Sequence, residues 1–197
     1  MRVLNRRLAA LTLCLGLAAT SVLAAEDPSP KVKFATTAGD FVIEVYPDKA
    51  PKTVENFLQY VKDKHYDGTI FHRVINNFMV QGGGFDTTYV QKATRPPVTH
   101  EGREALAKGG PRNAVGTVAM ARTSDPNSAT AQFFINVKDN AFLDPSPQSP
   151  GYTVFGKVVS GMDVVEKIKS MPTGPGGPFP SDVPRTPVVI TSATLVK

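Results

Sequence analysis

The stretch FHRVINNFMVQGGGFD, residues 71–86, is the most informative part of the sequence, because it combines two short β-like runs with an arginine, a histidine and a glutamine. Residues 70–75 and 78–81 are rich in β-branched and aromatic residues. The pair Asn76-Asn77 that joins them tolerates the positive φ values that hairpin turns require. The stretch therefore predicts a β-hairpin with Arg73 on its first strand.

The chain on both sides of this hairpin has the pattern of further short strands and few helices. Residues 32–34 and 41–46 alternate around a Gly turn, which predicts a second hairpin. Pro51 then opens a segment with apolar residues at helical spacing up to Val61. Many strands and only two helices predict a mainly β fold, a closed β-barrel capped by two α-helices. The remaining β-like runs are residues 115–121, 132–137, 154–159 and 188–196, and the second short helix is expected at residues 162–168.

Two stretches are expected to lack regular structure. Residues 82–112 contain few apolar side chains and should cross the surface, although their length hints at a function. Residues 172–187 are rich in Pro and Gly and are expected to be a loop inside the domain, because only one strand follows them. The run at residues 82–84 lacks the Lys-Ser/Thr of a phosphate loop and is interpreted as a tight turn.

The first 25 residues have the pattern of a secretory signal peptide, with three early arginines, an apolar run over residues 8–19 and a small-residue end. Cleavage is expected after Ala24 or Ala25, which leaves residues 26–197 as a single domain without cysteine. The lone Cys14 follows Leu13, which disfavours lipid attachment. We therefore expect export, in the first instance to a bacterial periplasm, with full secretion as the alternative.

Charge and hydropathy limit the classes of partner that the mature chain is expected to bind. Removal of the three N-terminal arginines lowers the formal charge from +5 to +2, so the basic balance belongs largely to the leader. The sequence after residue 25 contains no cluster of Lys and Arg residues, so nucleic-acid binding is not expected. No later run approaches the roughly 20 apolar residues of a membrane-spanning helix, so no membrane insertion of the mature chain is expected. Partners are therefore expected among proteins.

Three windows together resemble the cyclophilin family of peptidyl-prolyl cis/trans isomerases, and the resemblance runs in order from about Val32 to Val196. The windows are FHRVINNFMVQGGGFD (residues 71–86), AMARTSDPNSATAQFFINVKDNAFLD (residues 119–144) and VFGKVVSGMDVVEKI (residues 154–168). The resemblance implies a closed eight-stranded antiparallel β-barrel capped by two α-helices. It also implies acceleration of rotation about X-Pro bonds in unfolded or flexible polypeptides, with no metal, nucleotide or redox cofactor.

The resemblance also implies a site. Arg73 falls on the family's catalytic arginine, and the walls of its proline pocket fall on Phe78, Met79, Phe134 and Leu143. Gln81 and Gln132 match polar groups that orient the peptide and the arginine, and the edge Ala121-Arg122-Thr123 should pair its backbone with substrate. Strict strand alternation would separate Phe78 from Met79, so a shared pocket requires a bend or bulge.

Two positions depart from the broader family. Phe142 stands where many cyclophilins carry tryptophan, so the indole N–H that hydrogen-bonds cyclosporin is missing and binding of that drug should be weak. Tyr152 aligns near the family's pocket histidine, beside an insertion at residues 145–150. Both changes are similar to those of bacterial envelope cyclophilins.

Other functions remain as alternatives. A proline-binding chaperone or scaffold module with incidental isomerase activity is the second hypothesis, and a hydrolase is a distant third. Strand parity would point His72 away from Arg73, so a structural role is expected for it. No Gly-x-Ser-x-Gly motif and no pair of histidines at zinc spacing is found in the sequence.

Overall fold

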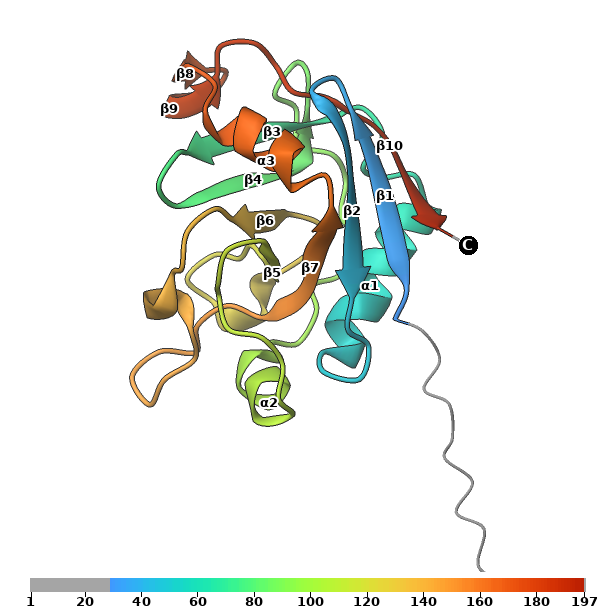
Figure 1. The fold of residues 1–197 in the computed structure, drawn as a ribbon, viewed down its shortest axis with the longest axis vertical. Helices are drawn as coiled ribbons and strands as arrows, with labels where there is room; N and C mark the ends of the chain where they lie inside the picture. The colour runs from blue at the N-terminus through green and yellow to red at the C-terminus, as the bar shows by residue number, and fades with distance from the viewer. Residues whose placement is uncertain (1–28, 197) are drawn as a thin grey trace, which may run out of the picture.

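The computed structural model describes residues 29–196, which form one curled β-sheet, three α-helices and a separate two-stranded hairpin (Figure 1). The sheet strands in chain order are β1 (Lys31–Thr36), β2 (Gly39–Val45), β3 (Thr69–Ile75), β4 (Met79–Asp86), β5 (Thr117–Met120), β6 (Phe133–Asn136), β7 (Val154–Ser160) and β10 (Ile190–Val196). They lie in the order β10, β1, β2, β7, β5, β6, β4, β3, and all neighbours are antiparallel. The predicted mainly β fold is confirmed.

The concave side of the sheet is filled by aromatic rings. Phe34 of β1 and Phe41 of β2 stack with ring centroids 5.2 Å apart, because alternate residues of each strand point inward. Helix α1 (Pro51–Lys62) inserts Phe57 among these rings, 4.9 Å from Phe155 of β7. These rings hold the sheet in its curl around a common core.

The sheet does not close into the expected barrel. In the described residues no ladder joins its two edge strands, β3 and β10; an isolated bridge links Ile70 of β3 to Val189, which precedes β10. Two backbone bonds flank the bridge, from the Phe71 N–H to the Val188 carbonyl (3.0 Å) and from the Gly68 N–H to the Ile190 carbonyl (2.8 Å). The closed barrel is therefore corrected to an open, curled half-barrel.

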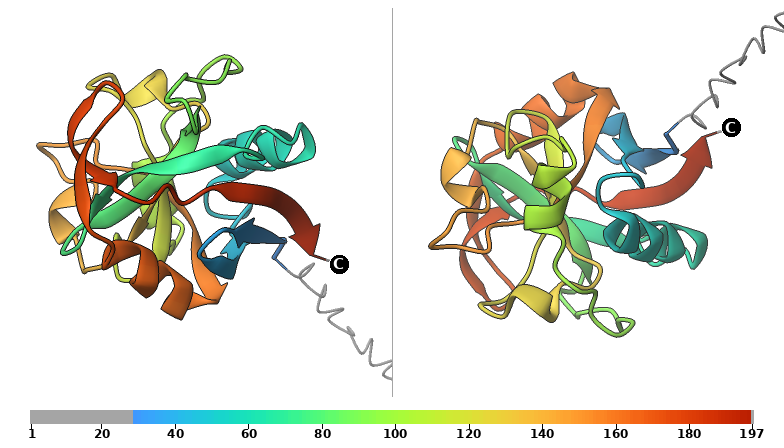
Figure 2. Two further views of the ribbon diagram at one scale, coloured as in Figure 1. Left: turned by 90° about the horizontal axis from the view of Figure 1, so that it is seen from above. Right: turned by 90° about the horizontal axis from the view of Figure 1, so that it is seen from below.

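The described residues contain three α-helices, where two were expected, and two short 3-10 helices at Pro126–Ser128 and Ala141–Leu143. Helix α3 (Met162–Lys169) lies toward the end that is uppermost in Figure 1, and α1 and α2 (Gly102–Ala107) lie toward the other end (Figures 1 and 2). Helix α2 interrupts the stretch 82–112 that was expected to be a surface loop, and β4 also extends into that stretch. A six-residue helix that begins with Gly and has no side-chain cap offers little sequence signal.

The Pro-rich stretch 172–187 is also more ordered than expected. It contains the hairpin β8 (Thr173–Gly176) and β9 (Phe179–Pro184), which packs beside β3. Gly177 makes the turn with a φ of +50°. The hairpin stands apart from the main sheet, so its prolines interrupt no central ladder.

The N-terminal residues 1–28 lie outside the described part of the chain, and with them the expected signal peptide and Cys14. None of the helices within residues 29–196 has both the length and the apolar character needed to cross a membrane.

Candidate active site

A β-bulge in β3 turns two consecutive side chains to the outer face of the sheet. Phe71 pairs with Gly82 and Arg73 with Gln81, so His72 has no partner residue in β4. His72 and Arg73 consequently line the same hollow. The expectation that strand parity separates His72 from Arg73 is therefore wrong.

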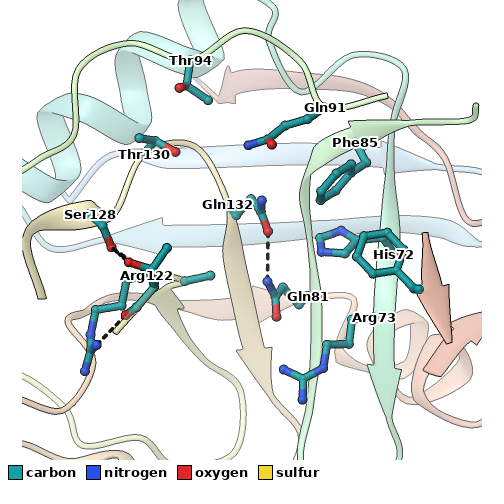
Figure 3. Close-up of a pocket in the computed structure, with 13 residues that line it drawn as sticks. His72, Arg73, Gln81, Phe85, Gln91, Thr94, Arg122, Ser128, Thr130 and Gln132 are labelled. Carbon is teal, nitrogen blue, oxygen red and sulfur yellow. Dashed lines mark hydrogen bonds between the residues drawn. The ribbon is translucent and has the colours of Figure 1, made fainter. Parts of the chain in front are cut away.

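The Arg73 side chain is exposed and uncommitted. Within residues 29–196 its guanidinium makes no hydrogen bond or ion pair, although Gln81 lies directly opposite it on β4 (Figure 3). An arginine keeps its charge at every physiological pH. Arg73 therefore presents free N–H donors and a positive charge to whatever enters the hollow.

A small pocket of about 160 Å³, with an apolar floor and a polar rim, opens beside Arg73. Its floor belongs to a cluster on the outer face that is separate from the main core and includes Met79, Phe134 and Leu143. Alternation in β6 explains the separation, since Phe133 and Ile135 enter the main core and Phe134 faces outward. The volume suits one side chain and is smaller than the roughly 300–1,000 Å³ of most small-molecule sites. The lining residues are Arg73, Phe78, Met79, Gln81, Ala121, Arg122, Phe134, Leu143 and Tyr152.

Phe78 and Met79 share this pocket because only Met79 belongs to β4. Phe78 lies in the preceding turn, where its N–H donates to the Ile75 carbonyl at 3.0 Å. This turn is therefore the bend that allows Phe78 and Met79 to share one pocket. Phe142 is placed differently from the other expected residues, because it is 71% exposed, stacks on Phe78 at 5.7 Å and lines neither hollow.

Gln81 and Gln132 form a polar link next to the pocket. The Gln81 Nε2 donates to the Gln132 Oε1 at 2.9 Å, and both side chains line the larger of two adjoining hollows (Figure 3). Gln132 itself is fixed because its carbonyl accepts the Ala121 N–H at 3.0 Å. The pair thus connects the Arg73 strand to the Ala121-Arg122-Thr123 edge.

The edge Ala121-Arg122-Thr123 follows β5 and borders both hollows. The N–H groups of Ala121 and Thr123 donate inside the protein, to Gln132 and to the Ser128 hydroxyl (2.9 Å). The Arg122 N–H is without a partner in the described part of the chain. The edge therefore offers fewer free backbone groups than its sequence suggested.

Tyr152 reaches the pocket despite the insertion at residues 145–150. Its N–H donates to the Leu143 carbonyl at 3.0 Å, which brings its ring edge-on to Phe134 with centroids 5.5 Å apart. The Arg122 guanidinium lies over the same ring at 4.5 Å. Tyr152 thus joins the apolar floor to the charged rim.

The larger hollow, of about 470 Å³, contains residues that sequence reasoning did not place in the site. Phe179 of β9 comes from the stretch expected to be a loop, and it packs on His72 at 5.2 Å and on Phe85 at 5.1 Å. No local pattern could have located it, because its place depends on how β9 folds back. The hollow is completed by Gln91, Thr94, Ser128 and Thr130.

His72 is held as a neutral ring. Burial, opposed by the Ile70 carbonyl and assisted by the charge of Arg73, lowers the pKa of His72 from 6.5 to about 4. Its Nδ1 has no hydrogen-bond partner within residues 29–196. A histidine that contacts aromatic rings and no hydroxyl does not activate a nucleophile, so the hydrolase hypothesis gains no support. Among the described residues, no group of three His, Cys, Asp or Glu side chains could hold a metal ion.

The fold and the site together define a curled β-sheet protein with an uncommitted arginine beside a small pocket on the outer face of the sheet. Residues 31–195 match the family described as cyclophilin type peptidyl-prolyl cis-trans isomerase/CLD. The chain belongs to this family and is a peptidyl-prolyl cis-trans isomerase of the cyclophilin type.

Individual relatives agree with this assignment. A peptidyl-prolyl cis-trans isomerase A from Dickeya dadantii is 50% identical over 193 residues, which cover 98% of each chain. A peptidyl-prolyl cis-trans isomerase B from Escherichia coli is 54% identical over 167 residues, or 83% of this chain and 98% of the relative. The fold is similar to that of a cyclophilin type isomerase from Cryptosporidium parvum, crystallised in the presence of the dipeptide Ala-Pro. That likeness has a TM-score of 0.67 at 23% identity and covers 85% of this chain and 99% of the other.

Proposed function

We propose that this isomerase accelerates rotation about X-Pro bonds in unfolded or flexible client proteins of the cell envelope, with Arg73 as its catalytic residue. The observation that carries the proposal is the uncommitted Arg73 guanidinium in the wall of the small apolar pocket. In this proposal the pocket holds the proline ring, and the peptide runs along the edge Ala121-Arg122-Thr123.

The energetic demand is within reach of noncovalent groups. The partial double bond of an amide resists rotation by about 18–20 kcal/mol, and uncatalysed X-Pro isomerisation takes tens to hundreds of seconds. A gain of about 10⁵-fold brings this to milliseconds and corresponds to roughly 7 kcal/mol of selective transition-state stabilisation. No bond to the substrate has to be made or broken.

Arg73 can supply a large share of that energy. At the twisted state the amide resonance is lost, so the proline nitrogen regains a lone pair that the planar amide lacks. A guanidinium donor beside that nitrogen stabilises the twisted state and not the planar one. Because arginine stays protonated, Arg73 acts as donor and charge, never as a base.

The pocket and the glutamines complete the mechanism. Phe78, Met79, Phe134 and Leu143 hold the ring and exclude the water that stabilises the planar, more polar amide. The hydrogen bond between Gln81 and Gln132 holds polar groups next to Arg73, where they orient the peptide and the arginine. The ring stays seated while that carbonyl turns.

A protease-coupled assay with a chromogenic Ala-Pro peptide tests the proposal. The purified protein should accelerate the slow phase, and Arg73→Ala should lower kcat/KM by about 100-fold or more, as loss of one preorganised donor does elsewhere. Retained peptide binding by that variant supports catalysis by Arg73. Equal acceleration by both proteins would overturn the catalytic role of Arg73, and absence of acceleration by the wild type would favour the proline-binding chaperone module.

The envelope location is supported by the leader pattern of residues 1–25. Fractionation of the producing cell and the intact mass of the recovered protein test it. Recovery outside the cytoplasm with a mass that lacks residues 1–24 or 1–25 supports the proposal. A full-length protein in the cytoplasm would contradict it.

A further inference from the structure

The two hollows carry positive charge without a carboxylate. Arg73 and Arg122 line both hollows, and neither lining contains an Asp or Glu residue of the described chain. Among the described residues no carboxylate pairs with Arg73 or Arg122. Asp86 accepts the Thr88 N–H at 2.8 Å, Asp125 accepts the Asn127 N–H at 2.9 Å, and Asp144 accepts from Arg112 at 3.2 Å. A bound peptide therefore meets an unneutralised cationic rim.

Arg122 is held in place on this rim by neutral groups only. Its guanidinium lies 4.5 Å from the centre of the Tyr152 ring. Its Nε and Nη2 donate to the Gly151 carbonyl at 3.1 and 2.8 Å, and its Nη1 donates to the Thr123 carbonyl at 2.8 Å. Carbonyls and a ring face fix the direction of the side chain but do not cancel its charge.

The position of Arg122 sets which substrate residues it can reach. Because it lines both the small pocket and the larger hollow, a proline seated in the pocket places its neighbours beside Arg122. One residue of extended chain spans only about 3.3–3.6 Å. The side chains next to the proline therefore pass within reach of this guanidinium.

From these contacts we infer that the enzyme prefers substrates with an acidic side chain adjacent to the proline, and that Arg122 determines this specificity. Tyr152 is a positioning residue, because it orients the Arg122 guanidinium. The inference rests on the proposed function, since it names the substrate class of the same site. It concerns the relative rates of different peptides, not the catalytic step itself.

Isomerisation of peptides that differ only next to proline tests the inference. Glu, Gln and Lys are placed immediately before the proline in one series and immediately after it in another. In at least one series, kcat/KM for the Glu peptide should exceed kcat/KM for the Gln peptide about three- to fivefold at low salt, because an exposed ion pair contributes a free energy of this size. The Lys peptide should have a lower kcat/KM than the Gln peptide. The preference should fade in 0.5 M NaCl because salt screens exposed charges.

Variants assign the effect to a residue. Arg122→Gln should bring the Glu/Gln ratio close to one, and Tyr152→Leu should reduce it, whereas Tyr152→Phe keeps the ring face and should retain it. Lys62→Gln on α1 removes the same charge from an exposed position outside both hollows and should keep the wild-type ratio.

The outcomes separate this inference from the proposed function. If the enzyme isomerises an Ala-Ala-Pro-Phe peptide but shows no preference for Glu in either series, the inference is overturned and the function stays intact. The same holds if the preference for Glu survives in Arg122→Gln. Absence of isomerisation for every peptide overturns the function itself. The ratio of kcat/KM between Glu and Gln peptides, and its dependence on salt, are measured on the wild type and therefore test the inference even where a variant fails to fold.

Discussion

Alanine replacements of Gln81 and Gln132, singly and together, measure how far the glutamine pair supports catalysis. The side chains are partly buried and joined by one hydrogen bond of 2.9 Å. Such a bond contributes about 0.5–1.5 kcal/mol net. If it orients the peptide in the transition state, each single variant should lower kcat/KM by about two- to tenfold.

The double variant carries the sharper information. When one glutamine is absent, the other has lost its partner, so its removal should cost little more. The expected coupling is about 1 kcal/mol in transition-state free energy, and the double variant should resemble either single variant. Gln59→Ala on α1 is the matched control, because Gln59 also donates through Nε2, to Asp63 at 2.9 Å, and lines neither hollow.

The assay is the protease-coupled rate at low substrate concentration, with folded content checked by circular dichroism for each variant. Fully additive losses would refute the reasoning, because they would mean that the two glutamines act independently. A loss in Gln59→Ala of similar size would show that the effect is one of stability and not of the site.

Two further predictions concern the residues beside the pocket. The pKa of His72 is lowered from 6.5 to about 4, so the unfolded chain takes up this proton first as the pH falls. The His72 contribution to the free energy of unfolding should therefore fall by about 3 kcal/mol between pH 7 and pH 4. In urea titrations over this range, the stability of the wild type should fall by that much more than the stability of His72→Phe, or about 1 kcal/mol per pH unit; an equal fall in both proteins would contradict it. Phe142 is exposed and lacks an N–H, so Phe142→Trp should tighten cyclosporin binding by about two- to tenfold in a fluorescence titration, and unchanged affinity would remove the indole from the explanation.

Local sequence patterns were sufficient for the elements that bury a regular apolar face. Alternation around the turn of β1 and β2, and helical spacing after Pro51, both correspond to observed elements. The same patterns could not decide how the sheet ends. Whether β3 and β10 join depends on the path of residues 185–189, which no local periodicity records.

In the site, too, some residues could be predicted from the sequence and others depend on how distant segments fold together. The resemblance brought Arg73, Met79, Phe134 and Leu143 to attention, and the structure gathers them around one small pocket. Strand parity failed at His72, because a bulge adds one residue and reverses the facing of side chains beyond it. Phe179 could not be found from its own surroundings in sequence, because its contacts with His72 and Phe85 join segments about a hundred residues apart.

The central claim is that Arg73 stabilises the twisted amide more than the planar one. Exchange NMR on a proline peptide at saturating enzyme measures the rate of rotation in the bound state, and a titration of the same sample measures affinity. For Arg73→Ala we expect rotation in the bound state to be slower than in the wild type by about 100-fold or more, with a Kd within about threefold of the wild-type value. The control is Arg95→Ala, which removes an exposed arginine paired with Asp63 and should match the wild type in both quantities. Bound-state rotation that stays as fast in Arg73→Ala as in the wild type would contradict the account.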